Sequence, residues 1–488
     1  MGVLSWMTFF PLIGAAVILA LPKNRPNLTR WTAAIASAVP FLLAVWLFAQ
    51  FDRNAAGLQF VEKVDWISAF HIQYFMAVDG LSVTMVILTA LLCFLCMFAS
   101  WGINRMVRGY YALFLLLETG MIGVFCALDF FLFFVFWEVM LLPMYFLIGI
   151  WGGPRREYAA IKFFLYTLAG SVLMLLSMIA LYFASSPHTF DMTQLWANAS
   201  AYGRTFQLVV YAALFIGFAI KVPVFPFHTW LPDAHVEAPT AISVILAGVL
   251  LKMGIYGILR ISYPILPVGS VYFAGALAVL GVINILYGAL CAMAQKDLKK
   301  LVAYSSVSHM GYCLLGMAAF TVAGVNGAVL QMFNHGTTTA MLFLLVGVIY
   351  DRAHHREIDG FGGLAHQMPI YTGIVSIAFF AALGLPGLSG FISEALVFLG
   401  AFPVFKGLTM LAVVGIVLTA GYMLWTLQRM FLGTLNEKYK SLPDINGREL
   451  FTLVPLAIIV IVLGVWPMPI LNMMSRSVIW VVEMAQKV

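Results

Sequence analysis

Charged residues are scarce in this sequence. Only 9% of its 488 residues are Asp, Glu, Lys or Arg, whereas 63% are hydrophobic. An ordinary soluble domain is about 25% charged. No soluble fold could hide so much apolar surface, so the composition excludes a soluble globular protein.

Cysteine and nucleotide-binding motifs are also few or missing. The five cysteines all lie in apolar runs, where cysteine behaves as a small hydrophobe, so they indicate neither a disulfide framework nor a metal site. The sequence has no GxxxxGK loop and no dinucleotide fingerprint. Its net charge of +6 comes from basic residues scattered along the loops, which argues against a nucleic-acid partner.

Apolar runs of about 20 residues recur along the chain, each long enough to cross about 30 Å of hydrocarbon as a helix. The first run has no cleavage site after it, so we interpret it as a retained span. We expect an all-α membrane protein, a single polytopic domain over residues 1–488, with about 14 transmembrane helices. The expected spans are 3–21, 31–49, 80–101, 110–127, 130–150, 160–184, 205–226, 239–260, 268–293, 301–319, 324–350, 368–400, 407–433 and 450–472.

Basic residues in the loops predict the orientation of these spans, because loops rich in Lys and Arg stay on the cytoplasmic side. One side collects 15 basic residues, including Lys299, Lys300 and Arg356. The other side collects seven, namely Arg53, Lys63, Arg204, Arg260, Lys406, Arg476 and Lys487. Both termini are therefore predicted to face the periplasm or its equivalent.

Two of the expected spans are interrupted by proline and glycine. The seventh contains Val222-Pro223-Val224-Phe225-Pro226, and the twelfth contains Leu385-Pro386-Gly387-Leu388-Ser389-Gly390. The breaks stand five spans apart in helices of opposite direction, as in two inverted five-helix repeats, which we place at residues 109–261 and 268–433. Broken helices at membrane depth line wet cavities or pack in protein, so a transport pathway competes here with a simple packing kink.

Four charged residues fall inside apolar spans and alternate in sign along the chain: Glu138, Lys221, Lys252 and Glu394. Each costs roughly 2.5 to 3.5 kcal/mol at a helix centre, so charges retained there usually pair or line an ion route. We expect Glu138 and Lys221 to form a breakable pair whose opening lets Lys221 release a proton. A fixed structural ion pair or a snorkelling head group is the alternative for each residue.

Two histidines extend this line, His309 in span 10 and His335 in span 11. Histidine can pass protons near neutral pH, although a lone buried histidine is often only a hydrogen-bonded packing residue. Lys162 is expected to snorkel, and Glu118 and Asp129 are minor candidates. The segment 228–237 offers His and carboxylate ligands, but its prolines and spacing favour an ordered loop over a metal site.

Together with these buried residues, four longer segments resemble the antiporter-like subunits of respiratory complex I, and the resemblance extends over nearly the whole chain. The resemblance rests on FFVFWEVMLLPMYFLIGIWGG, KVPVFPFHTWLPDAHVEAPTAISVILAGVLLKMGIYGILR, AQKDLKKLVAYSSVSHMGY and LPGLSGFISEALVFLG. The family's proton-transfer residues fall on Glu138, Lys221, Lys252, Glu394, His309 and His335. Glutamate at Glu394, where the L and N types have lysine, resembles the M type (NuoM type).

Membership would imply a translocase subunit in a bacterial inner membrane that moves protons while redox chemistry occurs in other subunits. NADH, FMN, iron–sulfur clusters and quinone would then bind to partner subunits and no cofactor to this chain, with L- and N-type subunits on its two flanks. Three alternatives stay open. They are a multisubunit sodium/proton antiporter, the photosynthetic ferredoxin-dependent plastoquinone complex, and a membrane scaffold whose charges only hold helices together.

Overall fold

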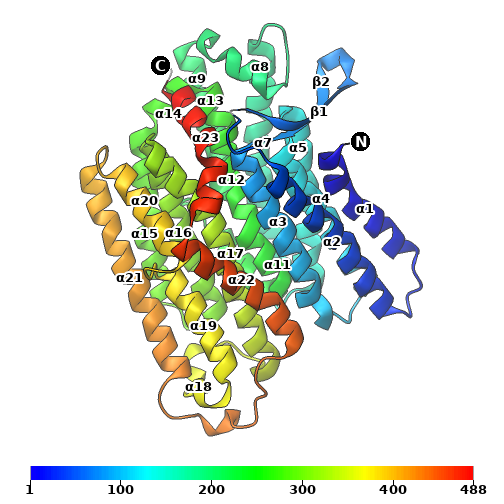
Figure 1. Cartoon of the computed structure of the whole chain (residues 1–488), viewed down its shortest axis with the longest axis vertical. Helices are drawn as coiled ribbons and strands as arrows, with labels where there is room; N and C mark the ends of the chain where they lie inside the picture. Colours follow the sequence, from blue (N-terminus) through cyan, green and yellow to red (C-terminus); the bar gives the residue numbers. More distant parts are fainter. Residues whose placement is uncertain (1, 56, 487–488) are drawn as a thin grey trace.

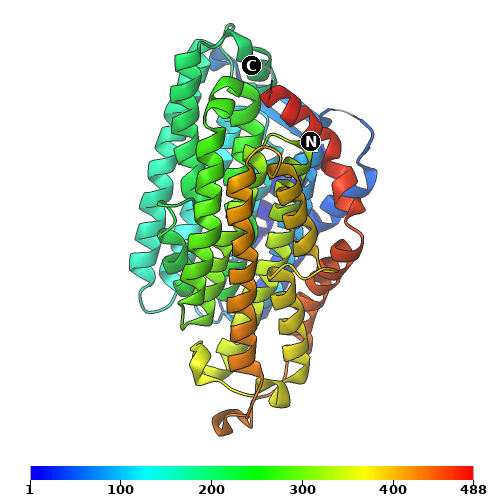
Figure 2. The same cartoon turned by 90° about the vertical axis from the view of Figure 1, so that its left-hand side faces the viewer.

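The computed structural model describes residues 2–55 and 57–486, so Lys487 lies outside the described residues. Most helices lie side by side along the long axis of the molecule (Figures 1 and 2). Among the described residues, 12 helices are long and apolar enough to cross a membrane. Adding α16 (Leu298–Ala318) and the broken pair α19 (Pro369–Ala382) and α20 (Ser389–Ala401) is compatible with the predicted 14, which stays a prediction. The chain is a multi-pass membrane protein.

The helices of the N-terminal half are α1 (Val3–Ala20), α2 (Pro26–Gln50), α3 (Gly80–Ala99), α4 (Val107–Cys126), α5 (Phe130–Val139), α6 (Leu141–Trp151), α7 (Arg156–Ala184), α8 (Met192–Ala197), α9 (Arg204–Lys221), α10 (Trp230–Glu237), α11 (Thr240–Ile245), α12 (Leu251–Gly257) and α13 (Tyr263–Ile265). Those that follow are α14 (Pro267–Tyr272), α15 (Ala274–Met293), α16 (Leu298–Ala318), α17 (Val322–Ala353), α18 (Leu364–Gln367), α19 (Pro369–Ala382), α20 (Ser389–Ala401), α21 (Lys406–Phe431), α22 (Gly447–Val465) and α23 (Met468–Ala485).

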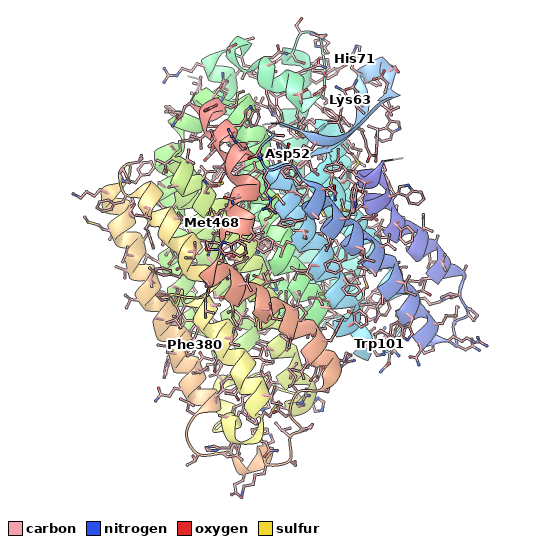
Figure 3. The ribbon with its side chains drawn as sticks, in the orientation of Figure 1. Asp52, Lys63, His71, Trp101, Phe380 and Met468 are labelled. Atoms are coloured by element: carbon pink, nitrogen blue, oxygen red, sulfur yellow. The ribbon has the colours of Figure 1, made fainter. Side chains whose placement is uncertain are left out.

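A two-stranded hairpin, which the sequence analysis did not predict, lies at one end of the molecule (Figure 1). Its strands β1 (Gln59–Ile67) and β2 (Ile72–Val78) pair antiparallel. The described ends of the chain lie in the same half of the molecule as this hairpin (Figure 1). Figure 3 places Lys63 and His71 at the hairpin end and Trp101 toward the opposite end. That opposite end is the one predicted to be cytoplasmic.

Both predicted helix breaks are present. Helix α9 ends at Lys221, and the chain turns through two prolines before α10 begins. Helix α19 ends at Ala382, and α20 begins at Ser389. The second break requires glycine, because Gly384 and Gly387 adopt φ angles of +77° and +93°, which side chains disfavour.

The helical run 240–265 carries Lys252 and is buried at every residue except Thr240. Two π-helical segments, Leu246–Leu250 and Ile258–Ser262, lie on either side of α12 within it. Such segments widen the helix by one residue per turn and are frequent at functional sites. Lys252 therefore stands between two irregular turns, which the hydropathy of the sequence did not reveal.

The C-terminal region differs from the predicted last span, 450–472. Helix α22 ends at Val465, and a separate helix, α23, begins at Met468 and reaches Ala485. The break follows from Pro467, which cannot donate a backbone hydrogen bond to the preceding turn. Ser477 of α23 accepts a hydrogen bond from the Gly80 amide at 2.9 Å, so α23 packs on the start of α3.

Candidate functional site

Lys252 and His335 are in direct contact. The Lys252 side chain is fully buried, and its Nζ lies 2.6 Å from Nδ1 of His335. Nζ also donates a hydrogen bond to the Ala247 carbonyl in the preceding π-helical segment. A π turn leaves backbone carbonyls without their usual helical partners, so it can orient this ammonium toward His335.

The contacts continue from His335 to Glu394. The rings of His335 and His309 are 5.5 Å apart, and Nδ1 of His309 lies 3.4 Å from Oε1 of Glu394. Nδ1 of His309 also lies 3.4 Å from Nε2 of Gln331. All three titratable side chains are at most 5% exposed.

Neutral polar groups frame these residues and a small cavity opens among them. Ser393 donates to Oε1 of Gln331 at 2.5 Å, and Asn334 donates to the Ser389 carbonyl at 2.7 Å. The cavity wall includes His309, His335 and Glu394. The structure therefore brings four of the predicted residues into one buried cluster, which we call the Lys252 branch: Lys252, His335, His309 and Glu394.

Glu138 and Lys221 are placed differently. Lys221 is 2% exposed, yet its Nζ makes no ion pair within 4 Å in the described part of the chain. It lies over the rings of Trp137 and Phe163, 5.2 and 5.7 Å from their centroids. Oε1 of Glu138 is buried without a hydrogen-bond partner. The expected pair is therefore open in this structure, with the ammonium held by aromatic faces.

The two parts of the site meet where α12 packs against α9. A side chain at Gly254 would come within 2.6 Å of the Phe218 carbonyl oxygen and of Val222. The absence of a side chain at Gly254 thus permits the helix that carries Lys252 to approach the C-terminal end of α9, where Lys221 lies. This close approach is the structural link between the broken helix and the central lysine.

Two further histidines, His228 and His235, are buried in the segment that the sequence analysis considered as a metal site. His228 is 2% exposed and His235 is fully buried, and neither ring has a hydrogen-bond partner for either nitrogen. Their segment was weighed only as a metal site, for which the described residues offer no suitable group of three or more ligands. The sequence feature that could have identified these histidines as candidates for proton transfer was their position beside a predicted helix break.

The minor candidates are all engaged in local contacts. Lys162 is 20% exposed and pairs with Asp233 at 2.7 Å. Glu118 is fully buried and accepts a hydrogen bond from Ser37 at 3.0 Å. Asp129 caps α5 through the Leu132 amide. Cys93 and Cys96 have a CxxC spacing but are free and buried.

Three basic residues that we counted among the loops, Arg30, Arg260 and Lys299, are buried. Arg260 is 1% exposed and pairs with Asp79, Lys299 is 4% exposed, and Arg30 is 8% exposed. Loop charge counts cannot distinguish such residues, because all three lie within one turn of a predicted span end. The predicted excess of basic residues on one side therefore becomes 13 against six when these three are set aside from the 15 and seven.

Comparisons with known proteins cover nearly the whole chain. Residues 127–419 match the family described as NADH:quinone oxidoreductase/Mrp antiporter, TM, and residues 7–127 match NADH-ubiquinone oxidoreductase chain 4, amino terminus. NADH-quinone oxidoreductase subunit M of Rhodobacter capsulatus is 44% identical, over 99% of this chain and 96% of that protein. NAD(P)H-quinone oxidoreductase chain 4 1 of Synechococcus elongatus is 45% identical, over 95% of this chain and 88% of that protein.

Solved structures give the same result for the fold. A chain of respiratory complex I from Thermus thermophilus with bound NADH superposes with a TM-score of 0.89 at 30% identity, covering 98% of this chain and 99% of that one. A chain of the Mrp complex from a Dietzia species has a TM-score of 0.87 at 24% identity, covering 98% of this chain and 97% of that one, a likeness of fold alone. By sequence and by structure, this chain belongs to the NADH:quinone oxidoreductase/Mrp antiporter transmembrane family.

Proposed function

We propose that this chain is a proton-translocating membrane-arm subunit of an NADH:quinone oxidoreductase, of the M type. The observation that carries the proposal is the Lys252 branch, a series of neighbouring buried titratable side chains. Charges at such depth mark ion routes unless they are locked in pairs, and Lys252 has no carboxylate partner within 4 Å among the described residues. The relatives with 44–45% identity favour this function over sodium/proton exchange.

In this proposal each group has one task. Lys252 exchanges a proton with His335 through the 2.6 Å contact, and His309 carries the proton on to Glu394. Glu138 and Lys221 act as a switch: pairing holds a proton on the Lys221 amine, and the open, aromatic-lined position lets it leave. The two breaks at α9–α10 and α19–α20 are the corresponding parts of two inverted repeats, residues 109–261 and 268–433.

The remaining assignments follow the same proposal. The chain holds no redox centre; NADH, FMN, iron–sulfur clusters and quinone bind to other subunits, and L- and N-type subunits flank this one. It lies in a bacterial inner membrane with both termini toward the periplasm. A plastoquinone complex is the second candidate, because the Synechococcus relative is as similar as the Rhodobacter one.

The test is a Lys252→Met variant in the assembled complex. Methionine keeps the length and apolar stem of lysine but carries no proton. We expect quinone reduction and proton pumping to fall together, by about tenfold or more, as for the loss of a proton-transfer group. The control is Lys296→Gln, at an exposed position before α16.

Wild-type pumping by Lys252→Met with intact assembly would refute the proposed proton route. The same membranes also discriminate the candidates. NADH as the effective electron donor supports complex I, reduced ferredoxin supports the plastoquinone complex, and sodium uptake without any electron donor supports the antiporter.

A further inference from the structure

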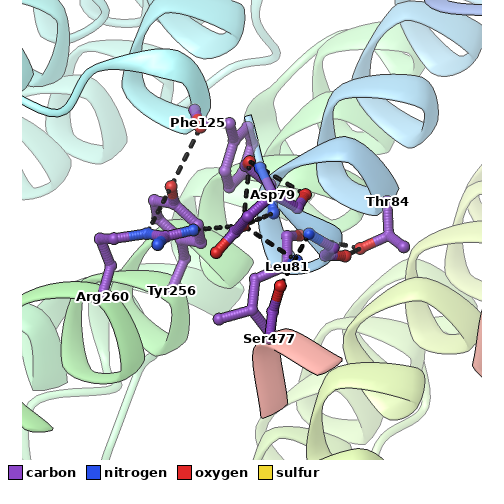
Figure 4. Close-up of polar contacts among 9 residues, drawn as sticks. Asp79, Leu81, Thr84, Phe125, Tyr256, Arg260 and Ser477 are labelled. Carbon is purple, nitrogen blue, oxygen red and sulfur yellow. Dashed lines mark hydrogen bonds and ion pairs between the residues drawn. The ribbon is translucent and has the colours of Figure 1, made fainter. Parts of the chain in front are cut away.

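The two ends of the Lys252 helical run differ in how their charges are compensated. At the hairpin end, Arg260 donates to Oδ1 of Asp79 at 2.5 Å and to the Tyr256 hydroxyl at 3.1 Å. Tyr256 in turn donates to the Phe125 carbonyl at 3.0 Å (Figure 4). Asp79 also accepts the Leu81 amide, at 3.1 Å. This end is closed by ion pairing and hydrogen bonds.

At the other end stands Lys299, a buried cation without a carboxylate partner. It is 4% exposed, and its Nζ donates to the Ala238 carbonyl at 2.5 Å. No described carboxylate lies within the 4 Å of an ion pair; the nearby Asp297 pairs with Arg356 at 3.2 Å. Burying a cation against one neutral acceptor is costly, so such a lysine indicates a functional position.

A cavity of about 360 Å³ opens beside Lys299. Its walls include Ser100, Glu237, Thr240, Lys299, Asp351 and Arg448. Ser100 ends α3 next to Trp101, which lies away from the hairpin end in Figure 3. Mixed charges and this volume suit a water-filled space, and the cavity lies at the end that the basic loops predict to be cytoplasmic.

His235 connects Lys299 to Lys252. The carbonyl that holds Lys299 belongs to Ala238, which ends the helix that carries His235. The His235 ring is fully buried, is stacked 4.5 Å from Phe343 and has both nitrogens unpartnered. Ser243, in the helical run that carries Lys252, donates a hydrogen bond to the His235 carbonyl at 3.1 Å, so this segment lies against that run. An unsatisfied imidazole among two lysines can accept a proton from one and give it to the other.

We propose that Lys299 is the proton-intake residue of the Lys252 branch, an inference that rests on the proposed function. The Lys299 ammonium gives a proton to the neutral His235 ring, directly or through water, and the imidazolium passes it to the neutral Lys252 amine. Water in the cavity then reprotonates Lys299. Because Asp79 and Arg260 close the hairpin end, the Lys252 branch loads from the cavity side only, and protons leave it sideways through His335.

The test compares Lys299→Arg with Lys300→Arg in the intact complex. Arginine keeps the charge and the hydrogen bonds, but it does not release its proton in a protein. Lys300 is the next residue, is partly exposed and is not in the cavity wall. We expect coupled quinone reduction and pumping to fall about tenfold or more for Lys299→Arg and to stay near wild type for Lys300→Arg. Wild-type pumping by Lys299→Arg overturns the proposal, because a structural lysine would be replaced by arginine without loss.

A second measurement does not depend on how Lys299 variants assemble. Gly102 borders the cavity, and a side chain there would meet no atom within 4 Å. We expect a bulky, membrane-impermeant thiol reagent to slow pumping by Gly102→Cys and to leave the control Gly407→Cys, equally free of neighbours, unaffected. Unchanged pumping after complete labelling of Gly102→Cys would show that protons do not enter here.

These outcomes are separable from failure of the proposed function. If Lys252→Met stops pumping while both Lys299→Arg and labelled Gly102→Cys pump normally, the Lys252 branch stands and the intake is wrong. If Lys252→Met itself pumps normally, the proposed function fails and the intake fails with it.

Discussion

The Lys252 branch and the Glu138–Lys221 switch differ in how their members are joined. In the branch, Gln331 and a small cavity lie beside His309 and Glu394, so a proton at this end has more than one neighbour. In the switch, Lys221 and Glu138 form no ion pair within 4 Å, and aromatic rings lie beside the Lys221 ammonium. We therefore expect the Glu394 end of the branch to tolerate single substitutions, whereas Lys252 and the two members of the switch have no substitute.

The largest effect is expected for Lys221→Met. This variant removes the only amine of the switch, so we expect coupled quinone reduction and pumping to fall by about a hundredfold, as for a missing general acid–base group. The measurement is proton uptake per quinone reduced in inside-out membranes. Lys162→Met is the matched control, because Lys162 lies in the same half but already has Asp233 as a partner.

An equal loss in both lysine variants would contradict the difference between the branch and the switch. It would mean that any buried or half-buried lysine in this half supports assembly, and that the switch has no special status. A loss confined to Lys221→Met would support a distinct role for the switch.

The second effect, of intermediate size, is expected for Trp137→Leu. A cation above an aromatic face gains about 1 kcal/mol, so removing this ring should shift Lys221 away from its open position and slow turnover about fivefold. Phe133→Leu is the control, because Phe133 stacks on Trp137 at 5.7 Å but is not one of the rings beside the Lys221 ammonium. Equal slowing by both variants would assign the effect to packing.

A smaller effect is expected for Glu394→Gln. His309 lies 3.4 Å from both Glu394 and Gln331, and these long contacts share one ring nitrogen. The cavity can supply water to His309 when the carboxylate is lost, so we expect about a threefold fall in pumping, well below the effect of a sole proton-transfer group. A fall as large as that of Lys221→Met would show that the branch lacks the redundancy inferred here.

The sequence predicted the membrane helices and both breaks well, because these depend on local patterns. An apolar run of about 20 residues has few alternatives to a spanning helix, and Pro386 with Gly387 can hardly continue one. The hairpin β1–β2 and helix α23 were missed. Each is too short or too mixed in composition to stand out, and tertiary packing decides both.

Within the site, the sequence identified the residues but not their connections. A charged residue inside an apolar run can be recognised from that run alone. The contact of Lys252 with His335, in contrast, joins residues 83 positions apart in the sequence. The sequence also did not show that the Lys221 ammonium lies over the Trp137 and Phe163 rings and makes no ion pair with Glu138. The burial of Arg260 and Lys299 depends on partners, Asp79 and Ala238, that no loop count includes.

The smallest effect is expected outside the membrane, where the hairpin supports the switch. Asp191 is 1% exposed, and its backbone bridges that of Asp129, the cap of the helix that carries Glu138. Burial alone would raise the pKa of Asp191, but hydrogen bonds from Lys63 and Thr193 hold it below the usual value. This stability is therefore present above the ordinary aspartate pKa and is lost as the pH falls through the lowered one.

Lys63→Gln should weaken this support at neutral pH. Lys63 is 37% exposed, so the pair contributes only about 0.5 kcal/mol. Hydrogen exchange of the hairpin amides should be about twofold faster at pH 7, since exchange follows the free energy of local opening. The difference between variant and wild type should shrink as the pH falls below that of ordinary aspartate ionisation, because both then lose the charged Asp191. A difference that stays constant with pH would instead assign the role of Lys63 to its contact with the Phe75 ring, 4.4 Å away, and would separate the hairpin from the electrostatics of the switch.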